Sequence, residues 1–327
     1  MQNQEELIHR AQVHNPWFTQ ENSISAIKAI AQSLDNAEEW LGSYPLLLNR
    51  PQRPLTVGII MAGNIPLVGF HDLLCTLITG NKALCKLSSS DNILMKHCIE
   101  QIKLRMPEYS PLIDIIETPM QNADAYIATG SNNSARYFEY YFRNTPSLIR
   151  KSRTSAAIIP PDYTDSELML LGNDVFQYFG MGCRSVTCMY LPLNFDFNRL
   201  FKAWEGHSEL INHHKYANNY TYHKAILLMD LAAHLDNGFV LLKERNVLEA
   251  SVAMINYVYY TTEKEALEQL QAQQDQIQCI SMRDPKGIKQ GVVFGRTQSP
   301  ALNDYADGID TLAFLIELMQ NNQTLTV

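Results

Sequence analysis

The strongest constraint on the fold is a repeated order of β-rich run, short turn and helical run between residues 55 and 143. Short apolar runs bounded by turn residues are typical of strands, and helices between successive strands favour parallel pairing. We expect strands at residues 55–62, 83–87, 113–117 and 125–128. We expect helices at residues 67–79, 92–105 and 132–143. This order predicts a parallel sheet with helices on both faces.

A second α/β region begins at Ala156, after a stretch of different character at 145–155. Its expected strands are residues 156–159, 186–191, 239–243, 253–260 and 278–282. Its expected helices are residues 165–178, 196–204, 222–235 and 263–273. A chain of 327 residues is long enough for two such domains. We therefore predict a nucleotide-binding domain at 1–150, a catalytic domain at 151–290 and a C-terminal segment, 291–327, that packs back across the domain interface.

The first 48 residues are expected to form two or three helices. The apolar residues of the run 24–34 fall on one helical face, and Asn22 and Ser23 are expected to cap that helix. The sequence NRPQRP at 49–54 breaks the pattern and predicts a linker.

The charge balance bears on the possible partners. The chain has 26 Lys and Arg residues against 34 Asp and Glu residues, a net charge of −8, and no basic run stands out. A nucleic-acid partner is therefore not expected. The N-terminal sequence lacks the apolar core of a signal peptide, and no apolar stretch is long enough to cross a membrane. We expect a soluble, cytoplasmic protein.

The six cysteines form no CxxC pair and no regular framework. This pattern is typical of reduced thiols in a cytoplasm. A zinc site would need Cys and His at short fixed spacings. His213 and His214 are adjacent and point in different directions on a helix or a strand, so no metal site is expected.

Three predicted strand ends carry polar groups, and ligands bind at such ends in open parallel sheets. On the turn 61–66, the Asn64 amide could face a developing oxyanion or simply occupy a left-handed turn. Lys86 closes an apolar strand and could hold ribose hydroxyls or phosphate, or merely extend towards solvent. Gly130 and Ser131 stand at the start of a predicted helix. The backbone N–H groups there could bind an anion, or Ser131 could be an ordinary N-cap. A GxGxxG fingerprint is absent from the sequence.

The segment FGMGCRSVTCMYLP places Cys183 after two glycines and before a β-rich run. Gly180 and Gly182 allow backbone turns that other residues resist, and they leave the sulfur open to a substrate. A free cysteine is more often a small buried hydrophobe than a nucleophile, so this segment alone does not decide between the two. Cys188, within the apolar run, is expected to be a core residue.

Taken in order, these motifs resemble those of the aldehyde dehydrogenase superfamily. The segments most similar to its acyl-CoA reductases of the LuxC (fatty-acid reductase) type are GNKALCKLSSSD, ATGSNNSARYF, FGMGCRSVTCMYLP and VVFGRTQSPALNDYADGIDTLAFL. The resemblance covers residues 55–310. It implies two doubly wound, three-layer α/β domains with the active site in the cleft between them.

The resemblance also implies roles for individual residues. Cys183 matches the thiolate nucleophile and Asn64 a donor to the oxyanion, with the Cys183 backbone N–H as a second donor. Lys86 and Ser88 match residues that hold the adenosine ribose. The positions expected to bind the cofactor are Ala62, Gly63, Lys86, Ser88, Ser89, Gly130 and Ser131, the last two on the pyrophosphate turn.

Three departures from the superfamily pattern narrow the expected chemistry. Oxidative members carry a water-activating glutamate, whereas the matching stretch here, KSRTSA at 151–156, has no carboxylate. A thioester without such a base survives to meet a hydride or another thiol. Ser89 stands where many NAD-using members have an acidic residue, which favours NADPH and leaves NADH open. Val292 stands where a glutamate holds the nicotinamide ribose, so that contact is missing or supplied elsewhere.

The expected function is NAD(P)H-dependent reduction of an acyl-CoA, or of an acyl group on another carrier, to the aldehyde through a thioester on Cys183. A nearby helix start, Arg184, or Lys151 with Arg153 could lower the pKa of the Cys183 thiol. The alternatives are a γ-glutamyl-phosphate-like reductase of acyl phosphates and a catalytically quiet scaffold in a multi-enzyme complex. A Cys hydrolase is disfavoured because no His partner is recognisable. A homodimer, or a complex with an acyl-transferring enzyme, stays open.

Overall fold

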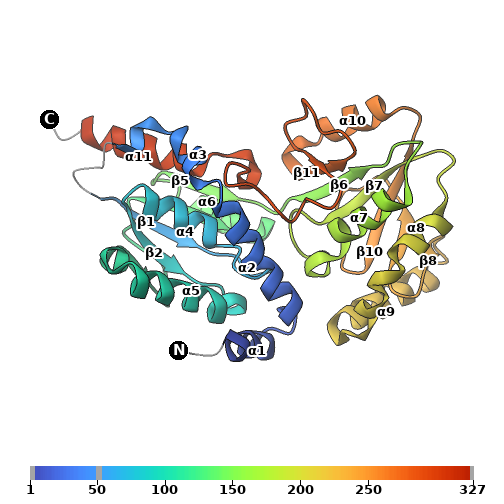
Figure 1. The fold of residues 1–327 in the computed structure, drawn as a ribbon, viewed down its shortest axis with the longest axis horizontal. Helices are drawn as coiled ribbons and strands as arrows, with labels where there is room; N and C mark the ends of the chain where they lie inside the picture. The colour runs from blue at the N-terminus through green and yellow to red at the C-terminus, as the bar shows by residue number, and fades with distance from the viewer. Residues whose placement is uncertain (1–3, 49–53, 325–327) are drawn as a thin grey trace. The chain divides into compact units, whose positions relative to one another are not determined.

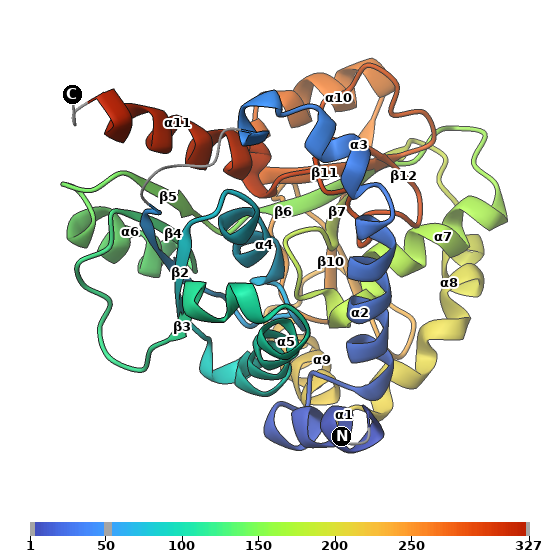
Figure 2. The same ribbon diagram turned by 60° about the vertical axis from the view of Figure 1, so that its left-hand side comes forward.

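The computed structural model describes residues 4–48 and 54–324. The chain divides into two units, Met1–Ser152 with Ala301–Val327, and Arg153–Pro300. Each unit contains one largely parallel sheet with helices packed on it (Figures 1 and 2). The C-terminal segment expected at 291–327 is thus divided between the two units. Residues 49–53 of the predicted linker lie outside the described residues.

The first sheet has five strands in the order β3-β2-β1-β4-β5, and all neighbouring strands are parallel. The strands are β1 (Thr56–Ile60), β2 (Lys82–Lys86), β3 (Ile113–Ile115), β4 (Ala125–Thr129) and β5 (Ser147–Arg150). The first four confirm the predicted strands, with ends that differ by a few residues. Strand β5 was not predicted, because it is short and follows Pro146 within the stretch 145–155.

Helices cover both faces of this sheet, so the first unit has three layers. Its longer helices are α4 (Phe70–Ile78), α5 (Asn92–Arg105), α6 (Asn132–Tyr141) and α11 (Thr311–Thr324). Val57 and Ile59 of β1 face a core shared with α4, α5 and α11. Tyr126 of β4 faces the opposite side, where its ring stacks on Phe142 at 3.8 Å between centroids. The alternation along the strands therefore separates two apolar layers.

The N-terminal helices are α1 (Gln4–His14), α2 (Gln20–Leu34) and α3 (Ala37–Gly42). The predicted cap of α2 was wrong, because the helix begins two residues before Asn22 and its N-cap is Thr19. The Thr19 side chain accepts a hydrogen bond from the Asn22 backbone N–H at 3.2 Å. Asn22 and Ser23 are buried in the first turn instead.

The second sheet has seven strands in the order β12-β11-β6-β7-β10-β9-β8. They are β6 (Thr154–Ile158), β7 (Val186–Pro192), β8 (Leu235–Asp236), β9 (Leu241–Glu244), β10 (Met254–Tyr260), β11 (Ile277–Met282) and β12 (Gly291–Val293). All pairs are parallel except β8 with β9. The edge strands β8 and β12 were not predicted, because two or three residues carry too little pattern.

The helices of the second unit are α7 (Asp165–Phe176), α8 (Phe197–Trp204), α9 (His214–Met229) and α10 (Glu263–Gln271). Residues of α7 and α8 pack on one face of the sheet and residues of α10 on the other. The helix predicted at 222–235 was misplaced. It begins eight residues earlier, where the His213 side chain accepts a hydrogen bond from the Tyr216 backbone N–H at 3.3 Å.

All six cysteines are free thiols. Cys188 is fully buried in β7, and burial raises its pKa to about 12, which confirms it as a core residue. Over residues 4–48 and 54–324, none of the helices is both long and apolar enough to cross a membrane.

Candidate active site

Cys183 lies on a turn between α7 and β7, and its side chain is half-buried. A 3₁₀ segment, η4 (Gln177–Gly180), leads into this turn. Three successive residues of η4, Tyr178, Phe179 and Gly180, have left-handed backbone, with φ of 54°, 58° and 73°. Residues with a side chain rarely adopt this backbone conformation, so contacts with the surrounding structure must hold the segment before Cys183 in place. Both aromatic side chains are buried.

Two buried serines hold the peptide groups on either side of Cys183. The Ser155 hydroxyl, on β6, donates to the Cys183 carbonyl oxygen at 3.0 Å. The Gly182 backbone N–H donates to the Ser185 Oγ at 3.2 Å. Because both serines are fully buried, these hydrogen bonds are shielded from competing water. The result is a turn with a fixed backbone around a half-exposed thiol.

The two glycines before Cys183 have different roles. Gly180 has a φ of +73°, and a Cβ atom there would also lie 3.2 Å from the Val175 carbonyl oxygen. Gly182 has no left-handed backbone, and a Cβ atom there would lie 3.4 Å from Ser185 Oγ, an ordinary contact. The expectation that both glycines permit an unusual turn holds for Gly180 and is wrong for Gly182.

The basic residues considered as activators of the thiol lie in separate environments. Lys151 forms an exposed ion pair with Glu139 at 2.8 Å. Arg153 donates to two backbone carbonyl groups near β11. Arg184 is buried, and its Nη1 lies 3.7 Å from the Sγ of Cys279. Of the three, Arg184 is the neighbour of Cys183 in sequence, and its charge is the one least screened by solvent.

In the first unit, the turn that carries Asn64 packs closely against the loop after β2. A Cβ atom on Gly63 would lie 2.4 Å from the Ser88 Oγ, so only glycine fits there. The Leu67 backbone N–H donates to Asp91 Oδ2 at 2.7 Å, and this bond holds Leu67 at a φ of +58°. Asn64 is exposed, and its backbone is not left-handed. The prediction that Asn64 simply occupies a left-handed turn is therefore wrong. Gly63 and Ser88, both assigned to the cofactor, are therefore brought together.

Lys86 and the serines after it occupy the carboxyl end of β2. The Lys86 ammonium donates to the carbonyl oxygens of Glu117 and Thr118 at 3.4 and 3.2 Å. Ser88 caps the 3₁₀ turn η2 (Ser89–Asp91), since its Oγ accepts from the Ser90 backbone N–H at 3.2 Å. Ser89 is exposed at the start of that turn.

Gly130 and Ser131 lie where β4 gives way to α6. A Cβ atom on Gly130 would lie 2.9 Å from the Ser134 Cβ, so the close approach of strand end and helix requires glycine. Ser131 is the N-cap of α6 and accepts a hydrogen bond from the Ser134 backbone N–H at 3.2 Å. The capping role predicted as the alternative is thus present. This cap uses one backbone N–H group of the first turn of α6, and the other N–H groups of that turn stay able to bind an anion.

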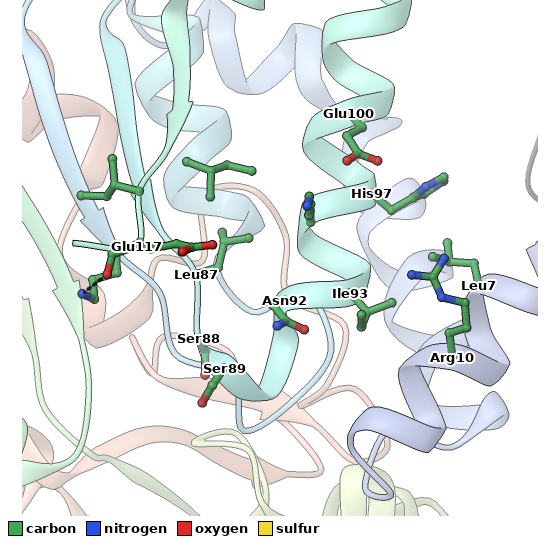
Figure 3. A pocket seen from close by; sticks show the side chains of 14 residues that line it. Leu7, Arg10, Leu87, Ser88, Ser89, Asn92, Ile93, His97, Glu100 and Glu117 are labelled. Carbon is green, nitrogen blue, oxygen red and sulfur yellow. Dashed lines mark hydrogen bonds between the residues drawn. The ribbon is translucent and has the colours of Figure 1, made fainter. Parts of the chain in front are cut away.

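A cavity of about 830 Å³ lies beside the end of β2, within the range typical of cofactor sites. Figure 3 shows Ser88, Ser89 and Asn92 at one end of it and Glu117 beside Leu87. Lys86 also lines the cavity. The cavity thus collects three of the residues assigned to the cofactor: Lys86, Ser88 and Ser89.

One wall of this cavity was missed by the sequence analysis. Leu7 and Arg10 come from α1, next to His97 of α5 (Figure 3). His14 Nε2 lies 2.6 Å from the Ser89 carbonyl oxygen, and Asn15 Nδ2 donates to the Ser90 carbonyl oxygen at 3.2 Å. These bonds join residues 75 positions apart, and no motif in the first helix signals them.

The solved structures most similar to this fold include aldehyde dehydrogenases from three bacteria. PutA from Anabaena variabilis, described as an aldehyde dehydrogenase, matches with a TM-score of 0.63 and 14% identity, covering 85% of this chain and 70% of that chain. A Mycobacterium tuberculosis aldehyde dehydrogenase complexed with NAD+ matches with a TM-score of 0.61 and 15% identity, covering 87% of this chain and 70% of that chain. A variant of AldC from Pseudomonas syringae, complexed with NAD+ and octanal, matches with a TM-score of 0.62 and 12% identity, covering 85% of this chain and 68% of that chain. The fold is that of an aldehyde dehydrogenase.

The model of the family described as acyl-CoA reductase (LuxC) matches residues 38–194. Over these residues, just under half of the chain, the sequence is similar to that family. The matched residues include Asn64, Lys86, Gly130 and Cys183, whereas α1 lies before them. Among curated proteins, none matches the sequence significantly.

Proposed function

We propose that this protein reduces an activated acyl group, most simply an acyl-CoA, to the aldehyde through a thioester on Cys183. The observation that carries the proposal is the half-exposed Cys183 on a turn held by two buried serines, within the residues that match the LuxC family. The lack of a carboxylate at 151–156 supports reduction over hydrolysis of the thioester.

We assign the cavity beside β2 to the adenosine half of a nicotinamide dinucleotide. The fit rests on its volume and on Ser88 and Ser89, which line it and carry hydroxyl groups. Gly63 lies behind this lining, in contact with Ser88. Two of the similar aldehyde dehydrogenase structures are complexes with NAD+. Since Ser89 introduces no carboxylate to repel a 2′-phosphate, NADPH is the expected cofactor, with NADH as the competing one.

In the proposed reaction, Cys183 Sγ attacks the carbonyl carbon of the acyl thioester, and the bond from that carbon to the CoA sulfur breaks. The thiol proton lost by Cys183 balances the proton gained by the released CoA. A bound reduced nicotinamide supplies the hydride that the acyl carbon then needs. Collapse of the resulting thiohemiacetal breaks the bond to Cys183 Sγ, releases the aldehyde and restores the thiolate. The Asn64 amide is assigned to hydrogen bonding with the oxyanion of the tetrahedral species.

The test is direct detection of the acyl-enzyme. The protein is incubated with acyl-CoAs of graded chain length without reductant, and the mass of the peptide containing Cys183 is measured. We expect one acyl adduct, which disappears with release of aldehyde when NADPH or NADH is added. Cys183→Ser should abolish the adduct and the release of aldehyde. Cys98→Ala, which removes a half-buried thiol in α5, should keep the adduct and the release of aldehyde.

Three other outcomes would change the proposal. An adduct formed only from acyl phosphates would favour the γ-glutamyl-phosphate-like alternative. An adduct that water removes as fast as hydride does would overturn the reductase assignment. Nucleotide binding without an adduct or aldehyde from any acyl donor would leave a catalytically quiet scaffold.

A further inference from the structure

A chain of buried hydrogen bonds runs through the second unit from α7 to the Cys183 turn. It begins at Asp174, a carboxylate that is only 1% exposed. One of its oxygens accepts from the Thr297 backbone N–H at 3.0 Å and from the Thr297 hydroxyl at 2.9 Å. The other accepts from the Gly295 backbone N–H at 2.8 Å and from the Ser281 hydroxyl at 2.6 Å.

Three of these hydrogen bonds fix the loop that follows β12, and the fourth joins Asp174 to Ser281 of β11. A buried carboxylate is costly unless donors surround it, so Asp174 and the loop depend on one another. Burial is the largest influence on this group and raises the pKa of Asp174 above its usual value, while the four donors oppose that rise. Gly295 has a φ of +77° and completes the bend. The next residue after this anchored loop is Gln298.

Gln298 connects the loop to the nucleophile turn. Its Nε2 donates to the Ser185 Oγ at 3.2 Å, and Gln298 is 7% exposed while Ser185 is fully buried. The same Oγ accepts from the Gly182 backbone N–H. A hydroxyl oxygen has two lone pairs, so these two donors use both and fix where the oxygen lies. Gln298 therefore determines the position of the acceptor that holds the peptide before Cys183.

The Cys183 turn has particular need of such a support. The left-handed residues Tyr178 to Gly180 precede it and would relax to an ordinary conformation without outside contacts. We infer that Gln298 is a positioning residue for the Cys183 thiol, acting through Ser185 and anchored by Asp174. This inference rests on the proposed role of Cys183 as the nucleophile. It adds a residue outside the range matched by the LuxC family model.

The test compares Gln298→Ala, Ser185→Ala and the double variant with a matched control, Gln290→Ala. Gln290 also donates from Nε2, but to the carbonyl oxygens of Gln274 and Ile277, which lie outside the Cys183 turn. Each variant is assayed for its melting temperature, for its single-turnover rate of acylation by acyl-CoA, and for alkylation of Cys183 by iodoacetamide across pH.

Gln298→Ala should slow acylation by about tenfold to a hundredfold, because a displacement of about 1 Å is enough for such a loss. It should also change the rate and pH midpoint of Cys183 alkylation, whereas Gln290→Ala should change neither. If Gln298 acts through Ser185, the double variant will react no more slowly than Ser185→Ala alone. Should Gln298→Ala fail to fold, the near-isosteric Ser185→Ala carries the same comparison with Gln290→Ala.

Unchanged alkylation and acylation in Gln298→Ala, or changes equal to those in Gln290→Ala, would overturn the inference. Fully additive losses in the double variant would also overturn it, because they would show that the two residues act separately. The alkylation assay needs no acyl donor. A wild-type protein that no acyl-CoA modifies would therefore refute the proposed function while the alkylation comparison still decides the role of Gln298.

Discussion

At the scale of single residues, the approach to Cys183 concentrates backbone strain where chemistry is proposed. Tyr178 and Phe179 take the left-handed conformation despite bulky side chains, and the Phe179 ring packs on His213 at 4.4 Å between centroids. Strain of this kind persists only where tertiary contacts over-determine the backbone. A glycine follows at the position with the largest φ of the three.

The two glycines of this turn should respond differently to alanine. Gly180→Ala should lower the free energy of unfolding by about 1–2 kcal/mol, because alanine is disfavoured at positive φ. Gly182→Ala should change it by less than about 0.5 kcal/mol, since its Cβ would make only ordinary contacts. Denaturant unfolding of both variants measures the difference. Equal losses would show that the turn does not depend on the left-handed residue.

At the scale of elements, the loop between β2 and α5 holds the turn after β1 through Asp91. This carboxyl is 3% exposed, and burial raises its pKa from 3.8 to about 7. Its hydrogen bond to the Leu67 backbone N–H opposes that rise. Both segments contain residues assigned to the cofactor, so the protonation of Asp91 bears on the candidate site as well as on stability.

We expect a pH-dependent contribution of Asp91 to stability. Between pH 4 and 7 the folded state keeps the Asp91 proton that the unfolded state has lost, so the free energy of unfolding falls as pH rises through this window. The slope from one group is at most about 1.4 kcal/mol per pH unit. Asp91→Asn should lack this contribution to the slope. Its free energy of unfolding should therefore rise relative to that of the wild type from pH 4 to 7. Denaturant unfolding across pH tests this, and parallel curves for the two proteins would contradict it.

At the scale of the whole molecule, the first unit is built from two separate parts of the chain. Its C-terminal helix α11 packs on α4 and contributes Leu312 and Leu315 to the core of the first sheet. A buried ion pair lies at this junction. Arg150 of β5 contacts Asp72 of α4 at 2.6 Å and donates to the Thr311 hydroxyl of α11 at 2.7 Å. Three elements far apart in sequence thus share one charged centre.

Removing one partner of this pair should be costly. Asp72→Ala leaves the Arg150 guanidinium buried without its carboxylate, and we expect a loss of about 3–5 kcal/mol in the free energy of unfolding. The matched control is Asp114→Ala, which breaks the exposed Lys82–Asp114 pair of similar length, 2.7 Å, and should cost less than about 1 kcal/mol. Similar losses in the two variants, measured by denaturant unfolding, would show that the buried pair does not hold α11 in place.

Most of the sheet architecture could be predicted because each longer strand or helix carries its own periodic pattern. The helix predicted at 92–105 matches α5 at both ends, since Asp91 and the apolar spacing mark it locally. The misplaced α9 and the missed β5 had weak local patterns, and packing of distant segments determined them. For α2, the choice of cap among Thr19, Asn22 and Ser23 was decided by which side chains the core buried.

For the candidate site, the sequence by itself determined the order of the motifs, the turn that carries Cys183 and the absence of a carboxylate at 151–156. These properties depend on residues adjacent in the chain. Only the tertiary structure decided that α1 forms a wall of the cavity, and that Asp174 and Gln298 support the Cys183 turn. Each of these contacts joins segments dozens of residues apart. Such contacts form when burial brings the segments together, and local spacing in one sequence carries no record of them.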